Sequence, residues 1–195
     1  MITYKNAELI IDKYDYCTSM NIGEYKNIDF LMYQKEIIEI LSCLNKDKVM
    51  LEWGCGGSTL FFSQYCKNLY SIESNRSWYT NIKNKLEKSK YENVKIIHES
   101  GEKYTKSVDE INEIFDVVFI DGIYRGKCLN YLVKSDKINE NTIIFIHDSL
   151  KYKNQIINSI KHFDIQKEIK VFWKPEPDGK EDIEHMIVLK RKKNV

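Results

Sequence analysis

Short apolar runs alternate with stretches of helical periodicity along most of the chain. Apolar runs bounded by turn residues are typical of buried strands, whereas apolar residues spaced three and four apart are typical of one helix face. The predicted strands cover residues 49–52, 68–73, 94–98, 115–121, 142–146, 169–173 and 185–189. The predicted helices cover residues 30–45, 60–65, 75–90, 110–114, 128–137 and 153–163.

This order of elements predicts an α/β fold. Strands that alternate with helices favour a mostly parallel sheet with helices on both faces. No helix is predicted between the last two strands, so we expect them to pair antiparallel. At 195 residues the chain is expected to be a single domain, residues 1–195. Residues 30–195 are predicted to form its core, and residues 1–29 a polar extension with a short helix and a loop over one edge of the site.

Composition and charge narrow the class of protein. Hydrophobic residues make up 43% of the chain and charged residues 30%, which indicates a soluble globular protein. The net charge of +1 gives no electrostatic reason to expect nucleic acid or a membrane as a partner. No apolar run reaches the length of a membrane span, and the first residues do not resemble a signal peptide. Scattered cysteines without zinc spacing predict reduced thiols and a cytoplasmic protein; they are Cys17, Cys43, Cys55, Cys66 and Cys128.

A cluster of small residues follows the first strand of the predicted core. That strand ends in Glu52, and the next residues include Gly54, Gly56, Gly57 and Ser58. Glycine permits positive φ and leaves no Cβ in the way of a ligand. A helix that begins behind such a turn offers unpaired N–H groups and a partial positive charge. The turn therefore suits a nucleotide-like ligand above the ends of parallel strands.

Acidic and polar residues close the next two strands. Glu73 ends the second strand, about 20 residues beyond the glycine turn, where a carboxylate can accept hydrogen bonds from ribose hydroxyls. Glu99 and Ser100 follow the third strand and are placed to flank an adenine ring. We expect all three to contact the nucleotide-like ligand.

Three ionisable residues close the fourth and fifth strands. Asp121 and Gly122 end the fourth strand, and His147, Asp148 and Ser149 end the fifth. Carboxyl ends of neighbouring parallel strands face the same crevice, so we expect Asp121, His147 and Asp148 to meet there. Two chemistries remain open at this point: a histidine acting as general base, or two carboxylates holding Mg²⁺. His98 and His162 lack such a context and are predicted to be structural.

These segments resemble the class I S-adenosylmethionine-dependent methyltransferases, in that family's order and spacing. The matching segments are 51–58 (LEWGCGGS), 70–73 (YSIE), 115–122 (FDVVFIDG) and 143–149 (IIFIHDS). Ser58 stands where the family usually has a third glycine, and Gly57 is an additional one. The resemblance implies a Rossmann-like doubly wound fold with seven strands, the last inserted antiparallel beside the fifth. It implies S-adenosylmethionine as cofactor, with contacts from Glu52, Gly54, Gly56, Gly57, Ser58, Glu73, Glu99, Ser100 and Asp121.

The resemblance extends to an acceptor class. Asp121 and Gly122, with Arg125 close behind, and the 147–149 segment resemble the branch of O-methyltransferases that act on sugars and polysaccharides. We therefore expect methylation of a sugar hydroxyl in a glycan or nucleotide sugar, with a small-molecule or glycan acceptor and no nucleic acid. His147 or Asp148 would act as base, Asp121 would orient the acceptor, and Arg125 would bind an anionic part of it. Related metal-dependent enzymes imply Asp121 and Asp148 as Mg²⁺ ligands.

Two other functions remain open from the sequence. The chain could be a binding domain that keeps the fold without catalysis, although the intact acids favour an enzyme. An NAD-dependent oxidoreductase shares the glycine turn, but the G-x-G-x-x-G spacing is missing. A further hypothesis concerns the loop at 174–182, which connects the last two strands and is expected to border the acceptor.

Overall fold

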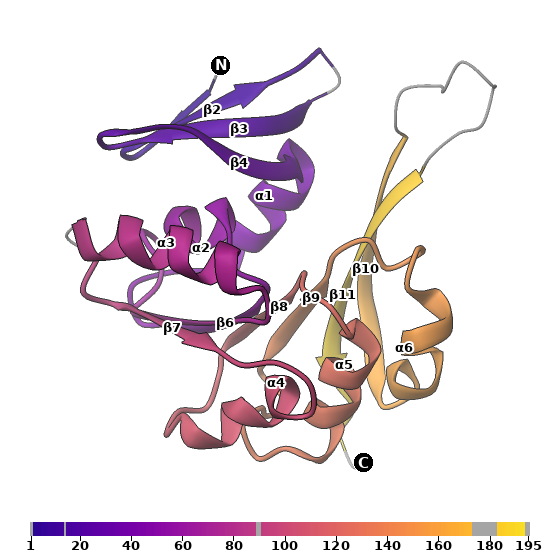
Figure 1. Ribbon diagram of the computed structural model, residues 1–195. Coiled ribbons are helices and arrows are strands. Elements are labelled where there is room, and N and C mark those ends of the chain that lie inside the picture. Colours follow the sequence, from indigo (N-terminus) through magenta and orange to yellow (C-terminus); the bar gives the residue numbers. More distant parts are fainter. Residues whose placement is uncertain (1, 14, 89–90, 173–182, 194–195) are drawn as a thin grey trace.

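The computed structural model describes residues 2–13, 15–88, 91–172 and 183–193, which form two sheets and the helices around them (Figure 1). The first sheet is β1 (Ile2–Tyr4), β2 (Ala7–Ile11), β3 (Tyr16–Ile22) and β4 (Tyr25–Tyr33). The strands of the second sheet are β5 (Val49–Trp53), β6 (Asn68–Glu73), β7 (Val94–His98), β8 (Val117–Ile120), β9 (Ile143–Ile146), β10 (Phe163–Phe172) and β11 (Ile183–Arg191). The helices are α1 (Gln34–Ser42), α2 (Gly57–Phe62), α3 (Arg76–Lys88), α4 (Lys103–Lys106), η1 (Ser107–Glu110), α5 (Arg125–Lys134) and α6 (Lys153–Ile160).

The seven-stranded sheet has the predicted topology. Its strand order is β10-β11-β9-β8-β5-β6-β7, with parallel pairs from β9 to β7. Strand β11 pairs antiparallel with both β9 and β10, so the last strand is inserted beside the fifth strand of the core. The mostly parallel, Rossmann-like α/β fold is confirmed, including the antiparallel last strand.

Helices cover both faces of this sheet, as Figure 1 shows for α1, α2 and α3 above it, α4 and α5 below it, and α6 beside β10. Strand β5 is buried along its whole length, and its side chains alternate between two apolar cores. Met50 packs in the core under α1, α2 and α3, whereas Leu51 and Trp53 pack in the core with α5 and α6. Burial on both faces explains why every residue of this strand except Glu52 is apolar.

The prediction for residues 1–29 is wrong: they form strands, not a short helix and a loop. Strands β1 to β4 pair in chain order as an antiparallel meander. The predicted helix over 30–45 begins only at Gln34, because Phe30 and Leu31 belong to β4. The burial of β4 alternates from Ile28 to Met32, a period of two that local helical spacing of apolar residues masked.

One further helix was misplaced. Residues 111–114 are not helical, and the helical turns lie just before them, in α4 and η1. Most remaining boundaries differ by a few residues, because element ends carry weak local signals. The largest difference is at β10, which begins at Phe163 and not at 169. The loop at 174–182 lies outside the described residues, so the hypothesis about it is not addressed.

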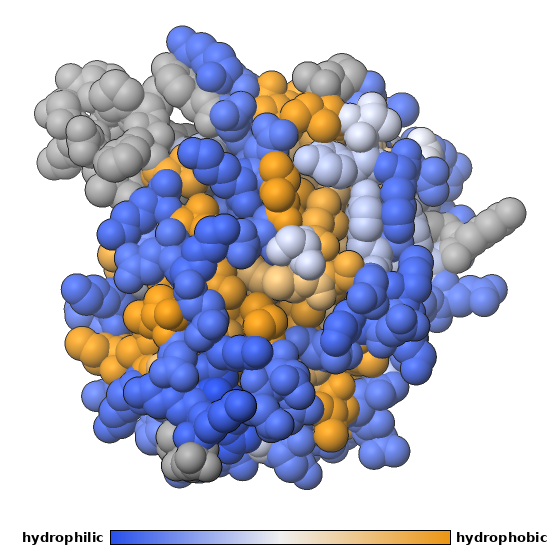
Figure 2. Space-filling view, turned by 180° about the vertical axis from the view of Figure 1, so that it is seen from behind, coloured by the Kyte–Doolittle hydropathy of each residue, from blue (hydrophilic) through white to orange (hydrophobic). Residues whose placement is uncertain are grey.

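The surface and the thiols agree with the composition. Seen from behind, hydrophilic residues cover most of the surface, with apolar residues gathered in a central strip (Figure 2). All five cysteines are free thiols, and four of them are buried. Within the described part of the chain, no helix combines the length and apolar character needed to span a bilayer.

Candidate functional site

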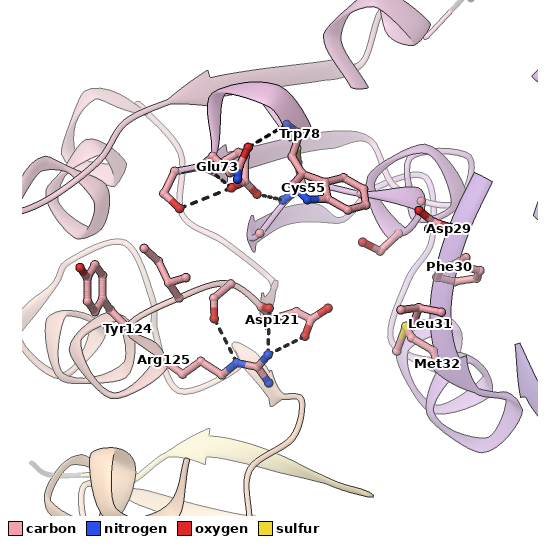
Figure 3. Close-up of a pocket in the computed structure, with 18 of the residues that line it drawn as sticks. Asp29, Phe30, Leu31, Met32, Cys55, Glu73, Trp78, Asp121, Tyr124 and Arg125 are labelled. Atoms are coloured by element: carbon pink, nitrogen blue, oxygen red, sulfur yellow. Dashed lines mark hydrogen bonds and ion pairs between the residues drawn. The ribbon is translucent and has the colours of Figure 1, made fainter. Parts of the chain in front are cut away.

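A cavity of about 640 Å³ opens where the carboxyl ends of β5, β6 and β8 meet β4 (Figure 3). This volume lies in the range of small-molecule sites. From the seven-stranded sheet and its helices, the lining residues are Gly54, Cys55, Gly56, Gly57, Ser58, Glu73, Ser74, Asn75, Trp78, Ser100, Gly101, Asp121, Gly122, Ile123, Tyr124, Arg125 and Tyr152. From the first sheet they are Asp29, Phe30, Leu31 and Met32. The glycine turn, Glu73, Ser100, Asp121 and Arg125 are thus brought together.

The three glycines of the turn serve different purposes. Gly54 has φ +98°, and a Cβ there would lie 2.7 Å from the Gly122 nitrogen, so the turns after β5 and β8 touch. A Cβ on Gly57 would lie 2.3 Å from the Asp29 carbonyl oxygen. Glycine at this position therefore lets β4 lie directly against the start of α2. At Gly56 the nearest atom would be 3.9 Å away, the Ser58 hydroxyl. Gly56 therefore leaves open the space into which a ligand can approach the backbone.

Glu52 lies beneath the turn and does not line the cavity. Its carboxylate accepts hydrogen bonds from Ser58 Oγ at 2.5 Å, Thr59 Oγ1 at 2.5 Å and Ser71 Oγ at 2.7 Å. Burial raises the pKa of Glu52 to about 7, because these hydroxyls only partly offset the loss of water. The expected cofactor contact is corrected to a support: Glu52 ties the turn to β5 and β6.

Glu73 faces the cavity from the end of β6. Its Oε2 accepts from the Cys55 N–H at 2.9 Å and its Oε1 from the Asn75 N–H at 2.6 Å. The Ser74 hydroxyl also donates to Oε1, at 3.4 Å. A carboxylate offers about four lone pairs, so these three bonds leave capacity for a ligand on Oε2. The side chain is thereby aimed beside the glycine turn, where ribose hydroxyls can donate to it.

The two residues after β7 that were expected to contact the ligand, Glu99 and Ser100, differ in their position relative to the cavity. Ser100 lines the cavity together with Gly101, whereas Glu99 does not. The Glu99 backbone N–H donates to the Glu73 carbonyl at 3.0 Å, a bond that continues the pairing of β7 with β6. Ser100 therefore lies where a ligand could reach it, whereas the expected contact of Glu99 has no support from the cavity lining and stays a prediction.

His147 is held between two carboxylates and does not line the cavity. Its Nδ1 lies 2.9 Å from Asp121 Oδ1, and its Nε2 lies 3.3 Å from Glu36 Oε2. Burial alone would lower the pKa of His147, but Asp121 and then Glu36 outweigh it and raise the pKa well above the usual value. An imidazole that is protonated near neutral pH cannot accept a proton. The geometry thus disfavours His147 as general base and makes it a link between α1 and Asp121.

Asp121 keeps its charge for the same reason. Burial alone would raise the pKa of Asp121, but His147 and then Arg125 outweigh it and lower the pKa. Both partners bind Oδ1, and Oδ2 has no hydrogen-bond partner among the described residues. Asp121 is therefore a fixed negative charge at the cavity with one oxygen available to a ligand.

Arg125 is a buried brace and not a free ligand for an anion. Its Nε donates to the Gly122 carbonyl at 3.1 Å, and its Nη2 to the Asp121 carbonyl and Oδ1, both at 3.0 Å. Nη1 donates to the His147 carbonyl, and the guanidinium lies 4.3 Å from the centre of the Tyr152 ring. These contacts occupy most of its five N–H groups and disfavour the expected role in binding the acceptor, which stays a prediction.

The donor set does not fit the expected Mg²⁺. Ligand atoms of Asp121, His147 and Asp148 lie within 4.8 Å of one another. However, Arg125 Nη2 lies 3.0 Å from Asp121 Oδ1 and 3.3 Å from Asp148 Oδ2, so a cation already neutralises this pair. Ser149 faces away, since its Oγ bonds to His185. A charged guanidinium and imidazole beside the carboxylates repel a divalent ion, and no step is assigned to a metal.

Asp148 is a further ion-pair partner of Arg125. It adopts φ +51°, lies 3.3 Å from Arg125 and does not line the cavity. Its expected role as base is therefore not favoured. The strained backbone of Asp148 is instead the position from which its carboxylate reaches Arg125.

Several lining residues escaped sequence reasoning. Asp29 and Leu31 line the cavity from β4. The sequence predicted a loop within residues 1–29 over one edge of the site, but it predicted no strand there and gave neither residue a role. Trp78, Tyr124 and Tyr152 come from the starts of helices and line the same cavity. Tyr124 has φ +55°, a left-handed conformation that is uncommon for a non-glycine residue, and the sequence carries no signal for it. The alternation of apolar and polar residues from Ile28 to Met32 is a sequence signal that could have indicated β4.

The fold is similar to that of solved structures of low sequence identity. Precorrin-6y C5,15-methyltransferase from Geobacter metallireducens matches with a TM-score of 0.62 and 15% identity, over 83% of this chain and 90% of that one. TYW2 from M. jannaschii, in complex with AdoMet, matches with a TM-score of 0.58 and 16% identity, over 91% and 93%. The tRNA (m1A58) methyltransferase TrmI from Aquifex aeolicus matches with a TM-score of 0.59 and 18% identity, over 83% and 70%.

These likenesses define the class: the chain has the Rossmann-like fold of the class I S-adenosylmethionine-dependent methyltransferases. The chain belongs to the family described as Conserved hypothetical protein 95, whose model matches residues 31–171. A comparison with curated proteins found no match.

The comparisons correct one expectation about partners. Similar structures include a tRNA methyltransferase and an rRNA methylase from Streptococcus thermophilus, so the expectation of no nucleic acid partner is wrong. That expectation rested on the net charge of +1, which averages over the whole surface and says little about the charge at a local binding site. The resemblance to sugar O-methyltransferases and the expected Mg²⁺ are not supported by these neighbours.

Proposed function

We propose that the chain is an S-adenosylmethionine-dependent methyltransferase whose cofactor lies over the glycine turn. The observation that carries this proposal is one cavity that joins the open backbone at Gly56 to the carboxylate of Glu73. Gly56 admits the ligand close to the chain, and Glu73 accepts from ribose hydroxyls. S-adenosylmethionine, when bound, supplies an electrophilic sulfonium methyl group.

The electrostatics of Asp121 favour a nitrogen acceptor. A carboxylate with a lowered pKa is a weak base, so it removes the proton of a sugar hydroxyl poorly. The same carboxylate stabilises the positive charge that develops on a nitrogen as its lone pair attacks a methyl group. Its free Oδ2 can also accept a hydrogen bond from an N–H of the acceptor. Asp121 thus orients the nitrogen and offsets its charge, and the surplus proton leaves afterwards to solvent.

We propose a base of RNA as the acceptor. Support comes from the tRNA and rRNA methyltransferases among the similar structures, and from the aromatic and apolar side chains around the cavity. Bases are commonly recognised by stacking on aromatic side chains. A sugar hydroxyl, as the resemblance implied, would need a general base, and Asp121 with its lowered pKa is a poor one.

The test is methyl transfer from labelled S-adenosylmethionine to unmodified tRNA and rRNA transcripts, with sugars, nucleotide sugars and catechols as alternatives. The product is digested and the methylated position located by mass spectrometry. Methyl groups on a base nitrogen are expected. Methylation of a hydroxyl oxygen would refute the nitrogen acceptor, and no binding of S-adenosylhomocysteine would refute the cofactor assignment. Asp121→Asn should lower kcat by about 10²-fold, in the range seen when one electrostatic stabiliser is removed.

A further inference from the structure

The first sheet forms one wall of the cavity, and most of this sheet lies outside the region that the family model matches. The family model begins at residue 31, whereas the sheet runs from Ile2 to Tyr33. Figure 1 shows this sheet above α1, α2 and α3. Asp29 and Phe30 therefore line the cavity from a part of the chain that precedes the matched region.

The first sheet is firmly packed against α2 and α3. The ring of Phe30 lies 5.0 Å from that of Phe61, and Tyr4 lies 5.8 Å from Phe61 in an edge-to-face contact. Lys5 Nζ donates to the Gln64 carbonyl at 2.7 Å, and the Tyr25 hydroxyl donates to the Lys85 carbonyl at 3.2 Å. Together with the tight approach of Asp29 to Gly57, these contacts fix the position of β4 relative to the cofactor turn.

Alternation along β4 turns two side chains away from this packing. Ile28, Phe30 and Met32 are buried, whereas Asp29 and Leu31 are exposed and line the cavity. Figure 3 shows them on the side of the cavity opposite Glu73, with Asp121 between the two sides. Because Glu73 marks the expected cofactor side, β4 lies on the side left for the acceptor.

Apolar surface is concentrated around this cavity. Four large apolar side chains that line it are strongly exposed: Leu31 (54%), Ile123 (45%), Tyr124 (42%) and Trp78 (41%). Single exposed apolar residues are ordinary, but a group around one cavity indicates a binding surface. The Asp29 carboxylate has no hydrogen-bond or ion-pair partner within the described ranges, and it can accept from an N–H group.

We propose that β4 selects the methyl acceptor, with Leu31 contacting the face of a planar heterocycle and Asp29 accepting from an N–H on its edge. The inference rests on the proposed function, and it names the heterocyclic base itself as the group that is recognised. A phosphate or another anion is a poor match for this wall because of the Asp29 charge.

The experiment uses the full chain saturated with S-adenosylhomocysteine, so that nucleosides cannot enter the cofactor site. Binding of adenosine, guanosine, cytidine and uridine is measured by saturation-transfer NMR, for the parent and for Asp29→Asn and Leu31→Ala. Glu24→Gln, in the turn before β4 and outside this cavity, is the matched control. At least one nucleoside should bind the parent and the control, and both β4 variants should weaken it at least fivefold. Affinity for S-adenosylhomocysteine should stay within twofold of the parent in every variant.

Three results would overturn the inference. These are no nucleoside binding to the saturated parent, unchanged nucleoside affinity in both β4 variants, and an equal loss of affinity for S-adenosylhomocysteine. The last would place β4 in the cofactor site. The proposed function fails separately, when the parent neither binds S-adenosylhomocysteine nor methylates RNA.

Discussion

Replacing Arg125 with methionine should destabilise the protein by about 3 kcal/mol. The guanidinium is 5% exposed, and its charge lies between the carboxylates of Asp121 and Asp148. Removing one partner of a buried ion pair costs about 3–5 kcal/mol. We expect the lower end of this range because the side chains of Asp121 and Asp148 are 29% and 22% exposed, so water can reach them. For a chain of this length, that loss corresponds to a fall in Tm of roughly 6–12 °C.

The assay is urea unfolding of the parent, Arg125→Met, Arg125→Lys and Lys127→Met. Lysine keeps the charge but lacks the planar fork, so Arg125→Lys should lose about half as much stability. Lys127, exposed on the same helix with its ammonium 4.7 Å from the Tyr124 ring, is the control and should change stability by less than about 0.5 kcal/mol. A free energy of unfolding within about 1 kcal/mol of the parent for Arg125→Met would refute the brace. It would return Arg125 to the role of an acceptor ligand.

Three other predictions follow from the site. Glu73→Ala should weaken S-adenosylhomocysteine binding roughly tenfold or more in calorimetry, since bonds to a charged acceptor contribute about 1.5–3 kcal/mol; equal affinity would contradict the ribose assignment. Dialysis against a chelator should leave the methyl-transfer rate unchanged, and a loss restored by Mg²⁺ would show that a metal is needed. Glu52 has a pKa near 7 when folded and 4.5 ordinarily, so the folded state holds a proton that the unfolded state has lost. Stability should therefore fall between about pH 4.5 and 7, less steeply in Glu52→Gln; equal slopes in urea unfolding would contradict this.

Five side chains of alternating charge, here called the string, explain why His147 is not available as a general base. Glu36, His147, Asp121, Arg125 and Asp148 follow one another through contacts of 3.3, 2.9, 3.0 and 3.3 Å. Each cation lies between two acids, which lowers the pKa of Asp121 and raises that of His147. The string connects the start of α1 to the ends of β8 and β9, and it presents the Asp121 carboxylate to the cavity.

Local sequence determined the strands of the core, the glycine turn and the place of the acids. Burial on both faces forces unbroken apolar runs such as Val117–Ile120, and a run of this kind is visible in the sequence without knowledge of the neighbouring strands. The acids that end β6 and β8 then fall at the same edge of the sheet by topology alone. This is why Glu73 and Asp121 could be placed at one site before any contact was known.

Only the tertiary structure decided what the polar side chains do. Glu36 and His147 are 111 residues apart in sequence, and their contact gives the imidazole its charge. Arg125 looked available because no local pattern shows that three carbonyls and two acids surround it. The wall formed by Asp29 and Leu31 likewise depends on β4 packing against α2 through Phe30. The spacing of hydrophobic residues can be read from neighbouring positions in the sequence. The charge and orientation of a buried polar group depend instead on residues that only the fold brings together.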